Sequence, residues 1–425
     1  MSFETVSVVG LGYIGLPTAA MFAAYGKKVI GVDVNPDAVA TINRGEIHIV
    51  EPELDIIVHK AVSDKKLKAV LSPEPADAFL IAVPTPFLPA TKRNDIPEPD
   101  LKYIEMAAKA VAKVLKQGDL VILESTSPVG ATEKMAEWLA QERTDLTFPQ
   151  THGGESDIRI AHCPERVLPG HVVRELVEND RVIGGLTAKC SELAAELYKT
   201  FVKGDCVITN ARTAEMAKLT ENSCRDVQIA FANELSVICD ELDIDVWELI
   251  SLANRHPRIN ILQPGPGVGG HCIAVDPWFI VSKTPEQAKL IHTARLVNDS
   301  KPEWVVDKVR MAISDFLQAN TEKTAKDVTV ACLGLAFKAD IDDLRESPAL
   351  EITKAIDHIH AGSLIAVEPN IEALPDVFSE KTLLTSLDNA LESADIIVVL
   401  VDHKEFREIS IQDKLVIDTK GIVRT

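Results

Sequence analysis

The chain has 425 residues, of which 46% are hydrophobic and 25% are charged. This composition is typical of a globular protein, and the length exceeds what one hydrophobic core accommodates. The 64 acidic and 44 basic residues give a net charge of −20, and a surface of that charge repels nucleic acid and anionic membranes. Apolar runs such as residues 396–401 fall well short of the roughly 18 residues that a membrane span requires. The first residues lack a basic region, so we expect no secretory signal.

The seven cysteines are odd in number, widely spaced and without a C-x-x-C pair. This pattern argues against a disulfide scaffold and against a bound metal such as zinc. Unpaired thiols are typical of a reducing compartment, so we expect a cytoplasmic protein.

The first half of the chain alternates between strand-like and helix-like segments. Residues 6–9, 28–32, 79–83 and 120–124 are β-branched or aliphatic runs, and residues 14–25 have a helical pattern. Strands that alternate with helices predict a parallel, doubly wound sheet.

The character changes after residue 213. Residues 213–242 form a helix-prone run without Gly or Pro, and a second helical stretch covers 285–316, where Pro302 is expected to introduce a kink. Strand-like runs then return at residues 328–332, 364–367, 396–401 and 415–417. We therefore predict an α/β protein with two Rossmann-like parallel-sheet domains, joined by a helical central region with a long interdomain helix. The expected domains are residues 1–205, 206–318 and 319–425.

A faint internal repeat links the two ends of the chain. Gly10-Leu11-Gly12 follows the first strand, and Leu333-Gly334-Leu335 stands in the corresponding place in the last part. Two mononucleotide-binding halves derived from one ancestral unit would explain this. Chance similarity among buried strands is the alternative.

The segment V-V-G-L-G-Y-I-G has the spacing of a dinucleotide-binding turn. The first glycine permits the tight turn, the second admits a pyrophosphate, and the third lets the helix pack closely on the strand. Asp33 ends the second strand, where a carboxylate accepts hydrogen bonds from ribose hydroxyls and favours NAD over NADP. A glycine turn beside an ordinary surface aspartate is the alternative. The predicted cofactor residues in this part are Gly10, Gly12, Tyr13, Ile14, Gly15 and Asp33.

The segment P-G-P-G-V-G-G-H-C-I-A-V-D contains the most specific chemistry. Its glycines, among them Gly269, expose backbone N–H groups that can surround a ligand. Cys272 follows directly and is a candidate nucleophile if a nearby cation lowers its pKa. A buried core cysteine is the alternative, and we favour that alternative for the other six cysteines.

Lys218 and Asn222 are four residues apart, so a helix presents both on one face. A lysine beside an asparagine suits the stabilisation of a developing oxyanion. On spacing alone, however, such a pair is more often part of a solvated helix face.

Further polar clusters follow strands. Pro84 and Thr85 follow one strand and are expected to line the cofactor crevice, and Thr126 follows another. The segment 163–170 resembles a rigid active-site loop. Each of these could be only a turn. In the last region, Lys338 and Arg345 offer cations for a pyrophosphate.

Six ordered motifs, GLGYIG, ESTSPVG, CPERVLPG, AEMAKLTEN, PGPGVGGHCIAVDP and FKADIDDLRESP, together resemble the UDP-glucose/GDP-mannose dehydrogenase family over essentially the whole chain. The resemblance implies NAD-dependent oxidation of the C6 alcohol of a UDP-sugar to a carboxylate, for cell-surface polysaccharide. It also implies a homodimer built on the middle helices, with Arg258 reaching the partner's substrate.

The resemblance implies individual roles for the candidate residues. Cys272 would form a thiohemiacetal and then a thioester, Lys218 and Asn222 would stabilise oxygen charge at C6, and Glu165 would act as a general base. Asp276 and Thr126 would hold an ordered water. Arg345 would lie at the cofactor crevice. The implied substrate contacts are Glu165, Arg166, Val167, Lys218, Asn222, Arg258, Gly269, Phe337 and Lys338.

Two departures from the UDP-glucose members concern the PGPG segment, which shortens the distance from Arg258 to Cys272, and the residues after Glu165. Both fit a UDP-amino-sugar with an N-acetyl group. The likeness favours the manno epimer at C2 over the gluco epimer, although no residue distinguishes them. A two-electron hydroxy-acid dehydrogenase and a non-catalytic sugar-nucleotide-binding protein are two competing hypotheses.

Overall fold

The computed structural model describes residues 3–89, 95–168, 170–270, 272–407, 409, 411 and 413–423. Pro169, part of the predicted rigid loop, lies outside the described residues. The chain divides into two compact units: unit 1 is Met1–Glu221 with Ser282–Thr284, and unit 2 is Asn222–Val281 with Pro285–Thr425. The three-domain division, with boundaries after residues 205 and 318, stays a prediction. Within the described ranges, no helix combines the length and apolar character that spanning a membrane requires.

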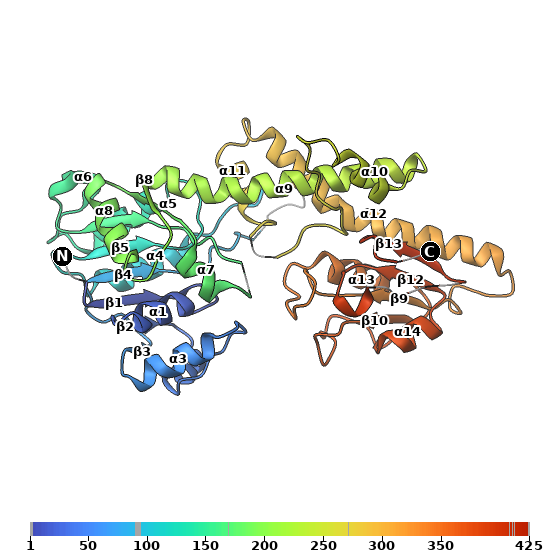
Figure 1. The fold of residues 1–425 in the computed structure, drawn as a ribbon, viewed down its shortest axis with the longest axis horizontal. Coiled ribbons are helices and arrows are strands. Elements are labelled where there is room, and N and C mark those ends of the chain that lie inside the picture. Colours follow the sequence, from blue (N-terminus) through green and yellow to red (C-terminus); the bar gives the residue numbers. More distant parts are fainter. Residues whose placement is uncertain are drawn as a thin grey trace. The chain divides into compact units, whose positions relative to one another are not determined.

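Unit 1 contains an eight-stranded sheet of order β3-β2-β1-β4-β5-β6-β7-β8 in its described residues (Figure 1). Neighbouring strands are parallel except for the antiparallel β6–β7 pair. The predicted parallel sheet is thus correct up to β6. The strands are β1 (Thr5–Val9), β2 (Lys28–Val32), β3 (Leu67–Val70), β4 (Ala78–Ile81), β5 (Leu120–Leu123), β6 (Arg159–His162), β7 (Arg181–Gly185) and β8 (Cys206–Asn210).

Helices cover both faces of this sheet because its strands are apolar on both sides. One buried cluster joins the sheet to α1, α2, α3, α7 and α8, and a second joins the opposite face to α4 and α5. These helices are α1 (Gly15–Ala24), α2 (Pro36–Asn43), α3 (Leu54–Ser63), α4 (Lys102–Ala112), α5 (Ala131–Glu142), α6 (Pro149–His152), α7 (Val172–Glu178) and α8 (Ala188–Tyr198), with the short 3-10 helix η1 (Gly153–Glu155).

Unit 2 contains a smaller, wholly parallel sheet of order β11-β10-β9-β12-β13 in its described residues. The four strands predicted here are confirmed, whereas the short β11 was not predicted. Its elements are α10 (Val246–Ala253), α11 (Asp276–Lys283), α12 (Lys289–Ala319), β9 (Val330–Leu333), α13 (Pro348–Ile359), β10 (Leu364–Val367), β11 (Thr382–Leu384), α14 (Leu387–Ser393), β12 (Ile396–Val399), η2 (Lys404–Phe406) and β13 (Leu415–Asp418).

The two sheets repeat one design, which supports the internal repeat seen in the sequence. The order 3-2-1-4-5 in unit 1 matches 11-10-9-12-13 in unit 2. Gly10 and Gly334 follow the equivalent strands β1 and β9 with φ of 93° and 95°. The N–H of Gly10 donates at 2.8 Å to the carbonyl of Val32, the last residue of β2. The N–H of Gly334 donates at the same distance, 2.8 Å, to the carbonyl of Val367, the last residue of β10. Each unit therefore has the same tight turn after its central strand.

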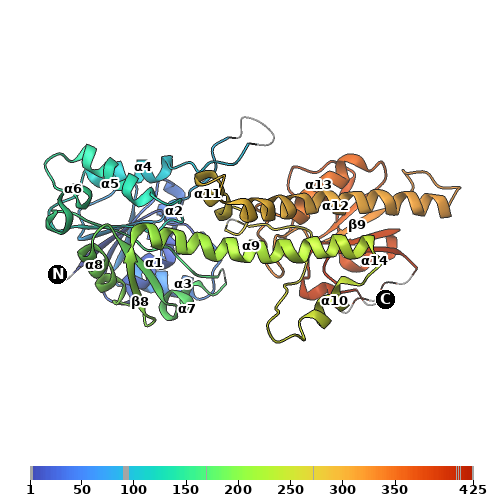
Figure 2. The ribbon, with the colours of Figure 1, turned by 90° about the horizontal axis from the view of Figure 1, so that it is seen from above.

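A long helix, α9 (Ala211–Glu241), contains the boundary between the units. Its part in unit 2 lies beside α12, as Figures 1 and 2 both show. Buried Arg295 on α12 forms an ion pair of 2.6 Å with buried Asp226 on α9. Pro302 lies inside α12, and this helix of 31 residues continues past it. Both long helices predicted from the sequence are confirmed.

Candidate functional site

The glycine turn after β1 has the geometry that a dinucleotide requires. A Cβ atom at Gly10 would lie 2.4 Å from the Ala82 carbonyl oxygen, and one at Gly15 would lie 1.7 Å from the Gly10 carbonyl oxygen. A Cβ at Gly12, in contrast, would meet nothing within 4 Å. The first and third glycines are thus required by close packing, while the second leaves open space above the start of α1. No side chain caps that helix start at Ile14, so its N–H groups can bind a phosphate.

Asp33 is fixed by the backbone around this turn. One carboxylate oxygen accepts from the N–H of Leu11 at 2.9 Å, and the other accepts from the N–H of Asn35 at 2.9 Å. Each oxygen retains a second lone pair. The carboxylate is therefore preorganised and can still accept ribose hydroxyls.

Other predicted residues follow the neighbouring parallel strands. Pro84 and Thr85 follow β4, and Thr126 follows β5. Because β1, β2, β4 and β5 are adjacent and parallel, their carboxyl ends share one sheet edge. The Oγ of Thr85 is buried and has no hydrogen-bond partner among the described residues. Tyr13 is 39% exposed in the glycine turn. These residues and the glycine turn together form the candidate NAD crevice of unit 1.

Glu165 lies three residues after β6 and is buried with an unexpected partner. The Nη1 of Arg181, the first residue of β7, donates to a Glu165 oxygen at 2.7 Å. The other Glu165 oxygen accepts from the N–H of Arg166 at 2.6 Å. Arg181 was not among the residues predicted from the sequence. The available signal was a charged residue at the start of an apolar strand, which requires a partner when it is buried.

Arg166 and Val167 continue this loop. The Arg166 guanidinium forms an ion pair of 2.7 Å with Glu221 on α9, and Val167 packs partly buried against the apolar core of unit 1. Lys218 lies half-buried on α9, one turn before Asn222. Arg166 is therefore already paired with a carboxylate of α9.

Cys272 lies in unit 2 on an exposed turn directly before α11. Its carbonyl accepts from the N–H of Asp276 at 2.9 Å, which fixes the turn to the helix start. Asp276 is buried, and one of its oxygens accepts from the Asn222 amide at 2.5 Å. Two of the predicted site residues, 54 positions apart, are thus in direct contact. The other six cysteines form no disulfide. Four of them are buried, as expected for core residues, whereas Cys206 is half-buried and Cys224 is exposed, so the expectation is wrong for these two.

The glycine loop before Cys272 packs against residues predicted for substrate. A Cβ at Gly269 would lie 2.4 Å from the Glu346 carbonyl oxygen, and Gly270, at φ 82°, has no room for one beside the Phe337 ring. Glycine is required at both positions because the loop backbone touches this ring and its neighbours. The structure therefore brings Phe337 to the Cys272 loop.

The three predicted cations of unit 2 have different surroundings. Lys338 is exposed and directly follows the half-buried Phe337. Arg345 forms an ion pair of 2.6 Å with Asp343. Arg258 is exposed in the loop after α10, where its backbone N–H donates to His256 at 3.4 Å. All three side chains are thus exposed, and Arg345 is held by a neighbouring carboxylate.

Asn233 on α9 anchors the start of the glycine-rich segment. Its Oδ1 accepts from the N–H of Gly265 at 2.9 Å, and its Nδ2 donates to Asn298 on α12 at 2.9 Å. Asn298 in turn donates to Asp226 at 2.8 Å. This buried chain holds the loop onto both long helices, and no local pattern in the sequence indicates it.

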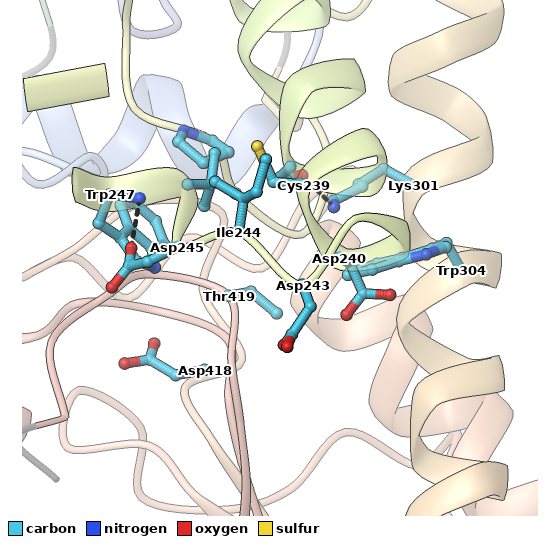
Figure 3. Close-up of a pocket in the computed structure, with 14 residues that line it drawn as sticks. Cys239, Asp240, Asp243, Ile244, Asp245, Trp247, Lys301, Trp304, Asp418 and Thr419 are labelled. Carbon is cyan, nitrogen blue, oxygen red and sulfur yellow. Dashed lines mark hydrogen bonds between the residues drawn. The ribbon is translucent and has the colours of Figure 1, made fainter. Parts of the chain in front are cut away.

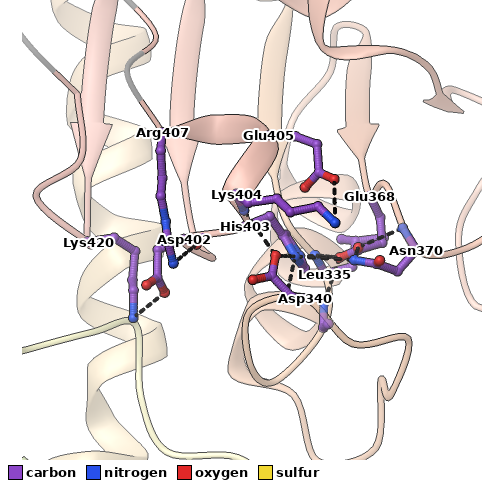
Figure 4. A network of polar contacts seen from close by, with 11 residues as sticks. Leu335, Asp340, Glu368, Asn370, Asp402, His403, Lys404, Glu405, Arg407 and Lys420 are labelled. Carbon is purple, nitrogen blue, oxygen red and sulfur yellow. Dashed lines mark hydrogen bonds and ion pairs between the residues drawn. The ribbon is translucent and has the colours of Figure 1, made fainter. Parts of the chain in front are cut away.

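A network of polar contacts at the end of β10 and β12 fixes the second glycine turn (Figure 4). Glu368 accepts from the N–H of Leu335 at 2.8 Å and pairs with His403 Nε2 at 3.0 Å. Burial raises the pKa of Glu368, but the bonds from His403 and Leu335 outweigh it and lower the pKa to about 2. His403 Nδ1 accepts from the N–H of Asp340 at 2.9 Å. Asp340, His403 and Glu405 lie close enough together to ligate a metal ion. Both ring nitrogens of His403 already take part in hydrogen bonds, however, so neither is available as a metal ligand.

A pocket of about 550 Å³ opens in unit 2 and was not predicted (Figure 3). Within it, the buried ammonium of Lys301 donates to Ser236 at 2.5 Å and lies 3.6 Å from the centre of the Trp304 ring. Burial lowers the pKa of Lys301 to about 7. None of the predicted site residues in the described ranges lines this pocket. Its lining includes Cys239, Asp240, Asp243, Trp247, Gly265 and Asp418.

Three domains of one protein family match three successive parts of the chain. Residues 4–202 match the NAD binding domain of the UDP-glucose/GDP-mannose dehydrogenase family, residues 212–300 its central domain, and residues 331–425 its UDP binding domain.

Individual relatives extend over the full length. The UDP-N-acetyl-D-mannosamine dehydrogenase of Yersinia pestis is 64% identical over 427 residues and covers 100% of both chains. The NDP-N-acetyl-D-galactosaminuronic acid dehydrogenase of Ralstonia nicotianae is 61% identical, over 99% of this chain and 97% of its own. Among solved structures, UDP-D-ManNAc dehydrogenase from Pyrococcus horikoshii is 39% identical with a TM-score of 0.86, over 99% of this chain and 96% of its own.

Proposed function

Because the chain belongs to the UDP-glucose/GDP-mannose dehydrogenase family, we propose that it oxidises the C6 alcohol of UDP-N-acetyl-D-mannosamine to the uronate. NAD is its cofactor, as the matching NAD binding domain indicates. The observation that carries the substrate assignment is the 64% identity, over the whole of both chains, to the enzyme of that name. Cysteines without disulfide partners support a cytoplasmic location.

When bound, NAD would supply the hydride acceptor for C6, and two NAD molecules would be needed in succession, one for each oxidation stage. The glycine turn would hold the pyrophosphate through Gly12 and the N–H groups of α1, and Asp33 would hold the ribose. In the first stage C6 also loses its hydroxyl proton and becomes an aldehyde. Lys218 and Asn222 stabilise the charge on the C6 oxygen at this stage.

The second oxidation requires a covalent bond to the enzyme. The Cys272 sulfur adds to the aldehyde carbon, and the proton released from the thiol goes to the carbonyl oxygen, giving a thiohemiacetal. Loss of a hydride from C6 and of the hydroxyl proton then leaves a thioester. Water, held by Asp276 and Thr126 and deprotonated by Glu165, attacks this thioester. The carbon–sulfur bond breaks, and the carboxylate and the free thiol are released.

Replacement of Asp33 by alanine tests the cofactor half of this proposal. The affinity for NAD is expected to fall by roughly 1–3 kcal/mol, because charge-assisted hydrogen bonds to the ribose are lost. Fluorescence titration of NAD measures the change, with Asp37→Ala as control, since Asp37 is an exposed aspartate on neighbouring α2. An unchanged dissociation constant for Asp33→Ala would rule out the ribose contact.

A homodimer is also part of the proposal. Phe231 and Ile238 on α9 are 51% and 46% exposed and lie seven residues apart on one helix face. Leu242, just beyond α9, is 61% exposed. A second copy of the chain would cover this apolar face, as the family resemblance implies. Light scattering is expected to give the mass of two chains, and the mass of a single chain at working concentration would contradict the proposal.

The sugar epimer has to be determined by comparing candidate substrates, because two relatives of nearly equal identity are named for different amino sugars. The second candidate substrate is a nucleotide-linked N-acetyl-D-galactosamine, which the relative at 61% identity supports. We expect kcat/KM to be highest for UDP-N-acetyl-D-mannosamine when the manno, gluco and galacto sugars are assayed under the same conditions. A higher value for either of the others would reassign the substrate but leave the chemistry in place.

A further inference from the structure

A buried polar cluster lies behind Glu165 in unit 1. Glu124 directly follows β5, Arg181 begins β7, and Tyr198 ends α8. These three residues are between 0% and 2% exposed, and Glu165 is 6% exposed. The topology thus brings four polar side chains from separate elements into one dry region.

The two carboxylates of this cluster have different partners. Arg181 Nη1 lies 2.7 Å from a Glu165 oxygen but 3.9 Å from the nearer Glu124 oxygen. Glu124 Oε1 instead accepts a hydrogen bond of 3.0 Å from the Tyr198 hydroxyl. The guanidinium also lies over the Tyr198 ring, 5.0 Å from its centre. The cation is therefore paired with Glu165, whereas Glu124 has only a neutral partner at hydrogen-bond distance.

The cluster has two carboxyl groups but one guanidinium, and this imbalance favours a proton on one of the carboxyl groups. Two ionised carboxylates beside one guanidinium would leave a net negative charge in a buried region. Among the described residues, the second oxygen of Glu124 is buried and accepts no hydrogen bond, although the neutral Thr18 hydroxyl lies close enough to lower the pKa of this carboxyl. Ionising a buried carboxyl oxygen that no donor stabilises is costly. A protonated Glu124 removes that charge.

We propose that Glu124 holds a proton in the resting enzyme and thereby keeps Glu165 as the ionised partner of Arg181, ready to act as the base. The inference rests on the proposed role of Glu165. Glu124 is a positioning residue, because it acts on the substrate only through its neighbours.

The electrostatic environment agrees with this arrangement. Burial raises the pKa of Glu124, as does the charge of Glu165, while Arg181 and the hydroxyls of Tyr198 and Thr18 lower it, with a result of about 8. Burial raises the pKa of Cys163 to about 12 and that of Tyr198 well above its usual range. Among these groups, Glu124 is therefore the one that changes charge near pH 8.

The sign of the pH effect follows from these charges. Below pH 8 Glu124 is neutral, and Arg181 is fully available to Glu165. As the pH rises through about 8, Glu124 ionises and competes with Glu165 for the one guanidinium. Turnover is therefore expected to fall above pH 8 in the native enzyme.

Glu124→Gln is the neutral mimic of the proposed state. This variant is expected to keep most of the native turnover at pH 7 and to lose the decrease above pH 8. Glu165→Gln is expected to lose about 10²-fold or more, as is typical for removal of a general base. Infrared difference spectra across this pH range should show the carbonyl band of a protonated carboxylic acid in the native enzyme and not in Glu124→Gln.

Three results would overturn the proposal: absence of the protonated-acid band in the native enzyme, its persistence in Glu124→Gln, or the same alkaline decrease in both. If Glu124→Gln does not fold, Tyr198→Phe replaces it. Loss of the phenol donor raises the pKa of Glu124, so the alkaline decrease should move to higher pH, and an unmoved decrease refutes the idea. Full activity of Glu165→Gln would instead remove the base from the proposed function, while the infrared band would still report Glu124.

Discussion

Replacement of Cys272 by alanine is expected to lower uronate formation by at least about 10³-fold, the scale on which loss of a catalytic nucleophile acts. Without the thiol, the aldehyde cannot become a thiohemiacetal, and the second hydride has no route to the thioester. Binding of the nucleotide sugar should be retained, because Asn233 and the packing on Phe337 both hold the glycine loop. Chromatography of the uronate and calorimetric binding of the UDP-sugar measure the two effects.

Cys224→Ala is the matched control for this variant. Cys224 is the other exposed cysteine of the chain, and it lies on α9 rather than on the glycine loop. Its replacement should leave uronate formation close to the native rate. Normal uronate output from Cys272→Ala would refute the covalent route.

Replacement of Lys218 by alanine is expected to lower kcat by about 10²–10³-fold, as does the loss of one group that stabilises an oxyanion. Lys218 is half-buried on α9, one turn before Asn222, whose amide is fixed on Asp276. Because Lys218 lies on a different element from the glycine turn that holds NAD, the dissociation constant of NAD should change little. Steady-state kinetics and NAD titration separate the two quantities.

Lys189→Ala serves as control, since Lys189 is an exposed lysine on α8 of the same unit. It should retain the native kcat. If Lys218→Ala turns over substrate as fast as this control does, Lys218 has no part in the chemistry.

Most strands were predictable because they are buried runs of aliphatic residues. Strand β2 covers residues 28–32 and β10 covers 364–367, both as expected from the sequence. The strands that were missed are β3, β6, β7, β8 and β11. Among them, β8 is mostly exposed, β6 has an arginine and a histidine at its two ends, and β7 begins with Arg181 and ends in two glycines. Gly184 is needed there because a Cβ would lie 2.2 Å from the Asn210 carbonyl oxygen. That requirement comes from the neighbouring strand and is invisible in the local sequence.

The candidate site was predictable where one segment carries all its residues, as in the glycine turn and the Cys272 loop. The resemblance added residues far apart in the sequence, and the contact between Asn222 and Asp276 shows two of them together. Arg181 and Tyr198 were missed because their importance depends on burial beside Glu165 and Glu124, and only tertiary packing creates that environment. The pairing of Arg345 with Asp343 was likewise not anticipated, although the two are neighbours in the sequence.

The central claim is that one carbon of the sugar loses two hydrides at a single thiol-containing site. The most direct test is the amount of NADH formed per mole of UDP-N-acetyl-D-mannosamine consumed, with the sugar limiting and NAD in excess. The proposed chemistry predicts two NADH per sugar with the uronate as the final product. One NADH per sugar, with an aldehyde or ketone as the product, would contradict it.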